Sequence, residues 1–211
     1  TSLYFNLTEA ENKAVMITGP SPGVGKSFIS VNLSTTCALA GQKVLLIDAD
    51  MRRGYLHRYI SKSHNNGLSE YLSGQKSIGD VITESHIDNL DVITRGQTPP
   101  NPSELLHHQR LQELISSCGQ SYDLILFDTP PVLAVTDAKI VGQSAGNTLL
   151  VCRFDKTSQR EIQHAQAQLQ RDGAKVTGAV LNGVEKRLSN YYGYGGYYGY
   201  GYGYTYKTRE S

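Results

Sequence analysis

A glycine-rich turn near the start of the chain limits its fold more than any other feature. The apolar run at residues 14–18 leads into Gly19, and helical sequence begins after Gly25-Lys26-Ser27. A strand, a tight turn and a helix in this order aim free backbone N–H groups at one point, which suits a phosphate. Lys26 would bring positive charge to the β- and γ-phosphates of a nucleotide, and the Ser27 hydroxyl would ligate Mg²⁺. Pro20 stands where the strict motif has its first glycine. The predicted nucleotide contacts in this loop are Ser21, Pro22, Gly23, Val24, Gly25, Lys26, Ser27 and Phe28.

Short apolar runs alternate with helical stretches along the rest of the chain. The runs lie at residues 14–18, 44–48, 90–94, 123–127, 148–152 and 176–181, and the helical stretches near 26–41, 67–73, 102–117, 134–144 and 158–171. Continuous apolar strands are typical of a parallel sheet that helices cover on both faces. The helix at 102–117 has the clearest start, with Asn101 as N-cap and Glu104 completing a capping box. The alternation predicts an α/β fold, a P-loop NTPase-like, mostly parallel sheet flanked by helices.

Acidic side chains follow two of the buried runs. One run ends in Asp48-Ala49-Asp50 and another in Asp128. Carboxyl ends of parallel strands face the crevice where ligands bind, so these groups should lie beside the glycine-rich loop. We expect Ser27, Asp48 and Asp128 to hold Mg²⁺, and Lys26, Asp48, Asp50 and Asp128 to be catalytic. Asp48 is favoured over Asp50 as the group that takes a proton. The alternative is that both carboxylates only organise the metal and its waters.

The C-terminal end differs in composition from the rest. Nine of the fourteen tyrosines lie between Tyr191 and Tyr206, among six glycines. This shift predicts a folded domain over 1–187 and a flexible Gly/Tyr-rich tail over 188–211. Twenty Lys and Arg balance nineteen Asp and Glu, which argues against a nucleic-acid partner. No apolar run approaches the roughly 20 residues of a membrane helix, so we expect a soluble fragment. Any membrane anchor would lie upstream of Thr1.

Taken together, these motifs resemble the bacterial tyrosine kinases (BY-kinases). The similarity is greatest to the cytoplasmic kinase domain of the Wzc-type polysaccharide co-polymerases, and it covers essentially the whole chain. It is carried by Gly25-Lys26-Ser27, by Asp48-Ala49-Asp50-Met51-Arg52, which that family calls Walker A′, and by Phe127-Asp128-Thr129-Pro130, its Walker B. The segment 99–106 and the tyrosine cluster complete the resemblance.

The resemblance implies a kinase that uses ATP and Mg²⁺ to phosphorylate its own tyrosines. It implies control of capsular or extracellular polysaccharide export, from the cytoplasmic side of a bacterial inner membrane. The implied partners are further copies of the chain, in a ring for the full-length protein, a cognate tyrosine phosphatase and the polysaccharide export machinery. It also implies an activating tyrosine at Tyr55, with Arg95 binding its phosphate. The expected phosphorylation sites in the tail are Tyr191, Tyr192, Tyr194, Tyr197, Tyr198, Tyr200, Tyr202, Tyr204 and Tyr206.

Other interpretations of the same residues stay open at this point. A MinD/ParA-like regulatory ATPase shares the Walker A′ architecture, but it usually has a second lysine where this chain has Ser21, and it lacks a tyrosine tail. The Gly/Tyr repeats alone would suit an adhesive or assembly module. Tyr55 could be an ordinary half-buried tyrosine. Asn182 could contact adenine, by analogy with related ATPases, or simply form an Asn-Gly turn.

Overall fold

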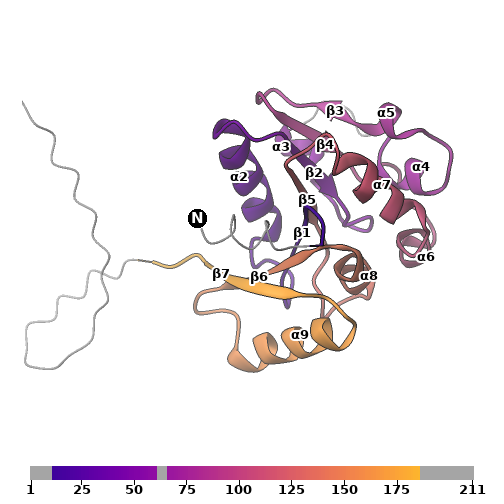
Figure 1. The fold of residues 1–211 in the computed structure, drawn as a ribbon. Coiled ribbons are helices and arrows are strands. Elements are labelled where there is room, and N and C mark those ends of the chain that lie inside the picture. The colour runs from indigo at the N-terminus through magenta and orange to yellow at the C-terminus, as the bar shows by residue number, and fades with distance from the viewer. Residues whose placement is uncertain (1–10, 61–65, 186–211) are drawn as a thin grey trace, which may run out of the picture.

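The computed structural model describes residues 11–60 and 66–185, and Figure 1 shows their arrangement. Within these ranges a seven-stranded sheet has the order β3-β4-β2-β5-β1-β6-β7. All neighbouring strands pair in parallel except β3, which is antiparallel to β4. The strands are β1 (Ala14–Thr18), β2 (Val44–Asp48), β3 (Thr83–Glu84), β4 (Leu90–Ile93), β5 (Leu124–Asp128), β6 (Asn147–Arg153) and β7 (Val176–Asn182). The predicted mostly parallel α/β fold is confirmed, whereas the nine tail tyrosines and the predicted boundary at 187/188 lie outside the described residues.

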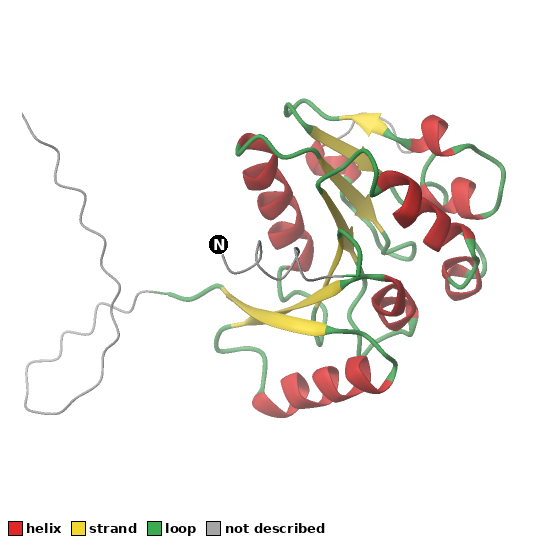
Figure 2. Cartoon of the chain, viewed as in Figure 1, coloured by secondary structure: helices red, strands yellow, loops and turns green. Residues whose placement is uncertain are grey.

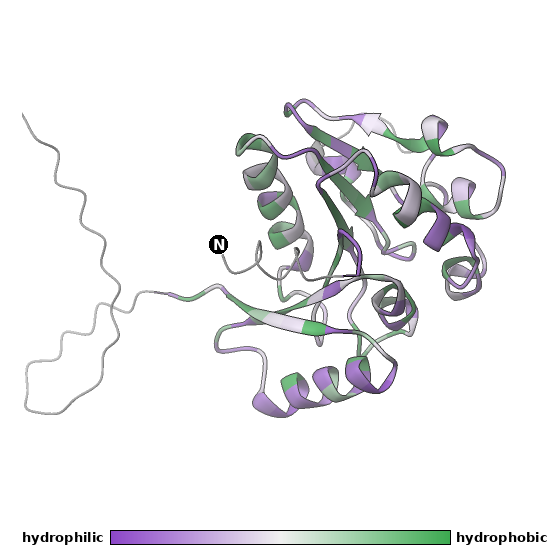
Figure 3. Ribbon diagram, viewed as in Figure 1, coloured by the Kyte–Doolittle hydropathy of each residue, from purple (hydrophilic) through white to green (hydrophobic). Residues whose placement is uncertain are grey.

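Helices cover both faces of this sheet (Figures 1 and 2). They are α2 (Lys26–Leu39), α3 (His57–Ile60), α4 (Leu68–Leu72), α5 (Ile78–Val81), α6 (Pro102–Leu106), α7 (Arg110–Cys118), α8 (Asp137–Ser144) and α9 (Gln159–Arg171). Helix α2 packs on one face, with Val15 and Ile17 of β1 beneath it. Helices α7, α8 and α9 pack on the other face, over Ala14 and Met16. Strand side chains thus alternate between two apolar layers, and Figure 3 shows the hydrophobic residues concentrated in these central strands.

The helix predicted at 102–117 is two helices, with a break at residues 107–109. Leu106 and Leu111 on either side of the break are both buried. In one continuous helix these two side chains would point about 140° apart, since successive residues turn by about 100°. The break lets both leucines reach the core, so burial outweighs helical continuity here.

The start of α6 also differs from the prediction. Asn101 is the N-cap residue, but its side chain makes no hydrogen bond to a backbone N–H of the helix. Its amide nitrogen instead donates to the Glu104 carboxylate at 2.5 Å. The expected capping box is therefore wrong, because the two side chains bond to each other.

The described residues contain neither a disulfide bond nor a helix that could span a membrane. All three cysteines, Cys37, Cys118 and Cys152, are free thiols. In the described part of the chain, no helix has both the length and the apolar character that crossing a membrane requires.

Candidate active site

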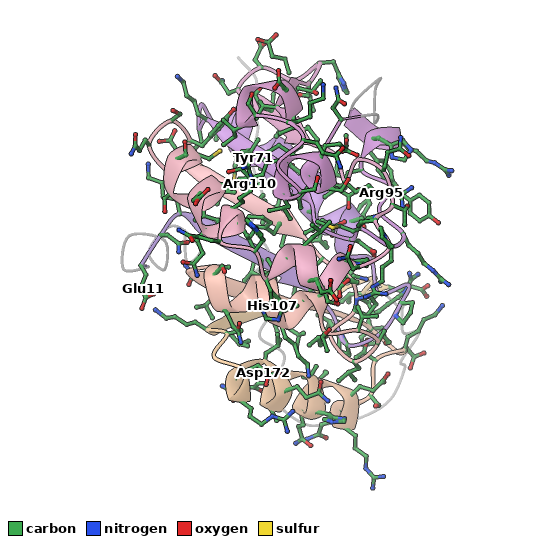
Figure 4. All side chains as sticks on the ribbon, turned by 90° about the vertical axis from the view of Figure 1, so that its right-hand side faces the viewer. Glu11, Tyr71, Arg95, His107, Arg110 and Asp172 are labelled. Carbon is green, nitrogen blue, oxygen red and sulfur yellow. The ribbon has the colours of Figure 1, made fainter. Side chains whose placement is uncertain are left out.

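The functional side chains gather where the parallel strands end. The predicted phosphate loop follows β1, Asp48 ends β2, and Asp128 ends β5. Arg95 follows β4 by two residues, and Figure 4 shows it on the opposite side of the molecule from Glu11, which precedes β1. Parallel pairing therefore brings four separate segments to one edge of the sheet, as expected for a ligand-binding crevice.

The phosphate loop is held in a conformation that needs glycine. Gly25 caps α2 with a φ of 96°, in the left-handed region. A Cβ atom there would also collide with the side-chain amide of Asn182. Two side chains support the loop from neighbouring strands. Asn182 Nδ2 donates to the Val24 carbonyl at 2.9 Å, and Arg153 Nη1 donates to the Gly23 carbonyl at 3.2 Å.

Lys26 is the first residue of α2 and lies near two carboxylates. Burial lowers the pKa of Lys26, while the nearby charges of Asp128 and Asp50 oppose that change. Asp128 is buried and is contacted by the hydroxyls of Ser27 and Ser30, the latter at 3.0 Å. Burial raises the pKa of Asp128 to about 6, although the two hydroxyls and Lys26 pull it down. The loop lysine, the hydroxyl of Ser27 and the Walker B carboxylate are thus one contiguous group.

The two Walker A′ carboxylates occupy different environments. Asp48 has no exposed surface, and its oxygens accept the backbone N–H groups of Asp50 at 3.2 Å and Leu56 at 3.1 Å. Gly54 lies so close to this carboxylate that a Cβ atom would collide with it. Burial and the neighbouring Asp128 raise the pKa of Asp48 well above its usual range. Asp50, in contrast, lines an open cavity.

That cavity has a volume of about 540 Å³. It is lined by residues of the phosphate loop, by four side chains in or just after Walker A′, and by apolar residues that follow β5. These residues are Pro22, Gly23, Lys26, Ser27, Asp50, Arg52, Arg53, Tyr55, Pro130, Pro131, Ala134 and Val135. A cavity of this size can hold part of a nucleotide and the group that reacts with it.

The remaining predicted nucleotide contacts lie around this cavity. The Ser21 hydroxyl contacts the Glu161 carboxylate of α9. Val24 is buried, and Phe28 at the start of α2 is 57% exposed. Asn182 contacts the loop by its hydrogen bond to the Val24 carbonyl. Its contact with adenine stays a prediction.

The two predicted regulatory residues border the same region. Tyr55 lines the cavity and is 49% exposed, with the Arg58 guanidinium 5.0 Å from its ring centre. Arg95 Nη1 donates to the Arg52 carbonyl at 3.4 Å, so Arg95 touches the loop that carries Tyr55. The structure therefore places Arg95 near that loop, while the phosphate-dependent role of the pair stays a prediction.

An ion pair that the sequence analysis missed anchors the Walker A′ loop. Arg52 donates from Nε and Nη2 to the two oxygens of Asp137, at 2.8 and 3.2 Å. Asp137 is fully buried at the start of α8 and also accepts the Ser103 hydroxyl of α6 at 2.7 Å. The only signal in the sequence is the arginine of Walker A′ itself, because nothing near Asp137 marks it as the partner.

The site suits a hard cation as well as a phosphate. Asp48 and Asp128 lie opposite each other in β2 and β5, and each is buried. A cation between them would favour the charged carboxylates and so offset the burial that raises both pKa values. Mg²⁺ prefers oxygen ligands and usually takes one or two carboxylates, keeping its other positions for water and phosphate. Within residues 11–60 and 66–185 no cluster of three or more His, Cys, Asp or Glu side chains could hold a metal by itself, so Ser27, a carboxylate and the substrate phosphates would share the ion.

Fold and site together define a P-loop nucleotide-binding domain with a Walker A′ motif. A model of the AAA domain family matches residues 12–163. The kinase domain of the Escherichia coli tyrosine kinase ETK superposes with a TM-score of 0.85 and 48% identity, covering 92% of this chain and 76% of that one. The chain therefore belongs to the AAA-domain family and, within it, to the bacterial tyrosine-kinase domains.

Two further comparisons show how similar the chain is to another kinase and to the ATPase MinD. A putative tyrosine-protein kinase in the cps region of Klebsiella pneumoniae is 47% identical over 193 residues. The match covers 92% of this chain and 27% of that protein, so the chain spans about a quarter of its relative's length. The cell-division ATPase MinD of Pyrococcus furiosus superposes with a TM-score of 0.69 at 26% identity, covering 81% of this chain and 71% of that one. The fold is thus shared with MinD, but similarity to the kinases is much greater, and the MinD/ParA-like alternative is not favoured.

Proposed function

We propose that this domain transfers the γ-phosphoryl group of ATP to tyrosine side chains. The proposal rests on one observation: a single cavity brings Lys26, Ser27 and Asp50 together with a tyrosine, Tyr55. In the reaction the phenol oxygen forms a bond to the γ-phosphorus as the bond to the β,γ-bridging oxygen breaks. ADP leaves, and the phenol proton passes to a carboxylate or to water.

Some groups of the site would stabilise the charge of the phosphates, and others would accept the proton. Backbone N–H groups of the loop and Lys26 would bind the phosphates, and Mg²⁺ held by Ser27, Asp48 and Asp128 would neutralise their charge when bound. Asp48 has the raised pKa of a candidate base. Asp50 lines the cavity, and so it is the competing candidate.

The proposed acceptors are the nine tail tyrosines, phosphorylated mainly by a neighbouring copy of the chain. Residues 190–206 could reach about 55–60 Å when extended, and about 20–25 Å as a flexible coil. Either length allows entry into an adjacent active site, and an oligomer would hold the tail at roughly millimolar effective concentration. Nine phosphates would add roughly −14 to −18 charges. Clustered tails would then repel one another and weaken the assembly.

The cellular role proposed here is regulation of capsular or extracellular polysaccharide export. It is supported by the Klebsiella relative, which is named for the cps region. In this role the full-length protein would sit at the bacterial inner membrane with the kinase domain in the cytoplasm. It would work with the export machinery, and a cognate tyrosine phosphatase would reset the tails.

A mixing experiment tests transfer between copies. A Lys26→Met protein with an intact tail is incubated with an active protein that lacks residues 188–211, together with ATP and Mg²⁺. We expect phosphotyrosine on the Lys26→Met tail, and a shift to smaller assemblies as phosphate accumulates. A tail that stays unphosphorylated while the two proteins associate would exclude transfer between copies. An unchanged assembly size after full phosphorylation would exclude the charge effect.

A further inference from the structure

Four apolar residues form one side of the active-site cavity, and the phosphotransfer chemistry described above does not use them. They are Pro130, Pro131, Ala134 and Val135, here called the acceptor wall. The other lining side chains include charged groups such as Lys26 and Asp50. An apolar surface gives no advantage to a water nucleophile or to a phosphate, so the wall needs another explanation.

The wall is held rigidly beside the phosphate loop. The Thr18 hydroxyl donates to the Pro130 carbonyl at 3.0 Å, and Val132 N donates to the Gly19 carbonyl at 3.0 Å. Leu133 N donates to the Pro20 carbonyl at 3.3 Å. These bonds join the segment after β5 to the end of β1 and the first residues of the loop. A ligand on the wall would therefore keep a fixed position relative to the nucleotide.

The far end of the wall is fixed as well. Val135 lies two residues before Asp137, the buried carboxylate that binds Arg52. Because Arg52 also lines the cavity, the ion pair ties the Walker A′ side to the wall side. The cavity thus has two anchored sides, with charged groups on one and apolar groups on the other.

A tyrosine side chain matches this division. Its ring can cover apolar surface while its hydroxyl points towards polar groups. Tyr55 shows that an aromatic ring is accommodated at the border of this cavity. The side chains of serine and threonine have no ring, so they would leave the wall in contact with water.

We propose that the ring of the acceptor tyrosine packs on the acceptor wall, which positions its hydroxyl for attack and selects tyrosine over aliphatic hydroxyls. This inference rests on the proposed kinase function and adds the residues that determine its acceptor. Burial of apolar ring surface supplies the affinity. The rigid attachment of the wall to the phosphate loop supplies the orientation.

The test separates acceptor binding from nucleotide binding. Ala134 is exposed, so Ala134→Gln adds a polar side chain to the wall without disturbing the core. Val135→Thr keeps the shape of the side chain and replaces a methyl group by a hydroxyl. Ala167→Gln, at an exposed alanine of α9, is the matched control. The acceptor is a synthetic peptide of residues 190–206, compared with the same peptide carrying serine at each tyrosine position.

We expect Ala134→Gln to raise KM for the tyrosine peptide about 10-fold and Val135→Thr to raise it less. Both variants should bind a fluorescent ATP analogue like the unchanged protein, and the serine peptide should not be phosphorylated. Unchanged KM in both variants would overturn the proposal, as would an equal loss of ATP-analogue affinity. If the unchanged protein phosphorylates no tyrosine at all, it is the proposed kinase function that fails.

Discussion

Arg153 and Asn182 lie opposite each other in β6 and β7, and they hold neighbouring carbonyl groups of the phosphate loop. Arg153 binds the Gly23 carbonyl, and Asn182 binds the Val24 carbonyl. Carbonyl oxygens that are held by side chains point away from the phosphate position, which leaves the N–H groups free for it. The pairing of β6 with the edge strand β7 therefore preorganises the loop that follows β1.

Removing this support should weaken nucleotide binding. We expect Asn182→Ala to lower ATP affinity about 5-fold, because one hydrogen bond contributes about 1 kcal/mol. Arg153→Ala should act in the same direction, since it removes the bond to the adjacent carbonyl. Titration with a fluorescent ATP analogue measures both effects, with Thr177→Ala on the same strand as the control. Unaltered affinity in both variants would show that the loop holds its shape without them.

The buried Asp128 should make the domain less stable as the pH rises. Its pKa is about 6 in the folded chain, above the usual 3.8. Between these values the folded state keeps a proton that the unfolded state has lost, so stability falls as pH rises through this window. At pH 8, without metal or nucleotide, Asp128→Asn should therefore be more stable than the parent, on the order of 2–3 kcal/mol.

Urea unfolding in EDTA at pH 8 and pH 5 checks this prediction. The advantage of Asp128→Asn should shrink at the lower pH, where the parent carboxyl is protonated. Asp88→Asn, at an exposed aspartate, should show no such advantage. An Asp128→Asn protein that is less stable than the parent at pH 8 would show that the buried carboxylate does not destabilise the fold.

Substitutions of Asp48 in Walker A′ and of Asp128 in Walker B should separate turnover from binding. Asp48→Asn should lower kcat about 100-fold, the usual contribution of a general base, with a smaller effect on ATP affinity. Asp128→Asn should instead weaken binding of Mg²⁺ and nucleotide. Steady-state kinetics and direct binding on both variants, with Asp50→Asn for comparison, measure this split. Equal losses of affinity in Asp48→Asn and Asp128→Asn would remove the case for Asp48, and a selective loss of kcat in Asp50→Asn would transfer the role to Asp50.

Tyr55 and Arg95 should act as one regulatory unit. A phosphate on Tyr55 could form charge-assisted hydrogen bonds with Arg95 and draw the ring away from the cavity. We therefore expect Tyr55→Phe and Arg95→Ala to lower tail phosphorylation by similar factors, with the double variant no worse than either. Tyr59→Phe, at another exposed tyrosine, serves as the control. Full activity of both single variants would mean that Tyr55 and Arg95 do not regulate tail phosphorylation.

The regular elements could largely be predicted because their signals are local. The six predicted strands agree with the structure to within one residue at each end. The two-residue β3 has no comparable signal, since a pair such as Thr83–Glu84 contains no repeat. The break between α6 and α7 could not be predicted either, because it depends on which leucines reach the core.

The candidate site could likewise be predicted only in part from the sequence. Lys26, Ser27 and Asp128 follow strands in recognisable motifs, and parallel pairing brings them together. The contacts that hold the site, such as Arg52 with Asp137, join residues 85 positions apart in the chain. Only the packing of α8 beside the Walker A′ loop brings this pair together, so no sequence pattern reveals it.

The most direct test of the kinase assignment is a map of phosphotyrosine by mass spectrometry after incubation with ATP and Mg²⁺. We expect phosphate on tyrosines between Tyr191 and Tyr206. We expect none in a folded Lys26→Met protein, since that change removes the charge that acts on the γ-phosphoryl group. ATP hydrolysis without phosphotyrosine, or normal phosphorylation in Lys26→Met, would contradict the kinase assignment.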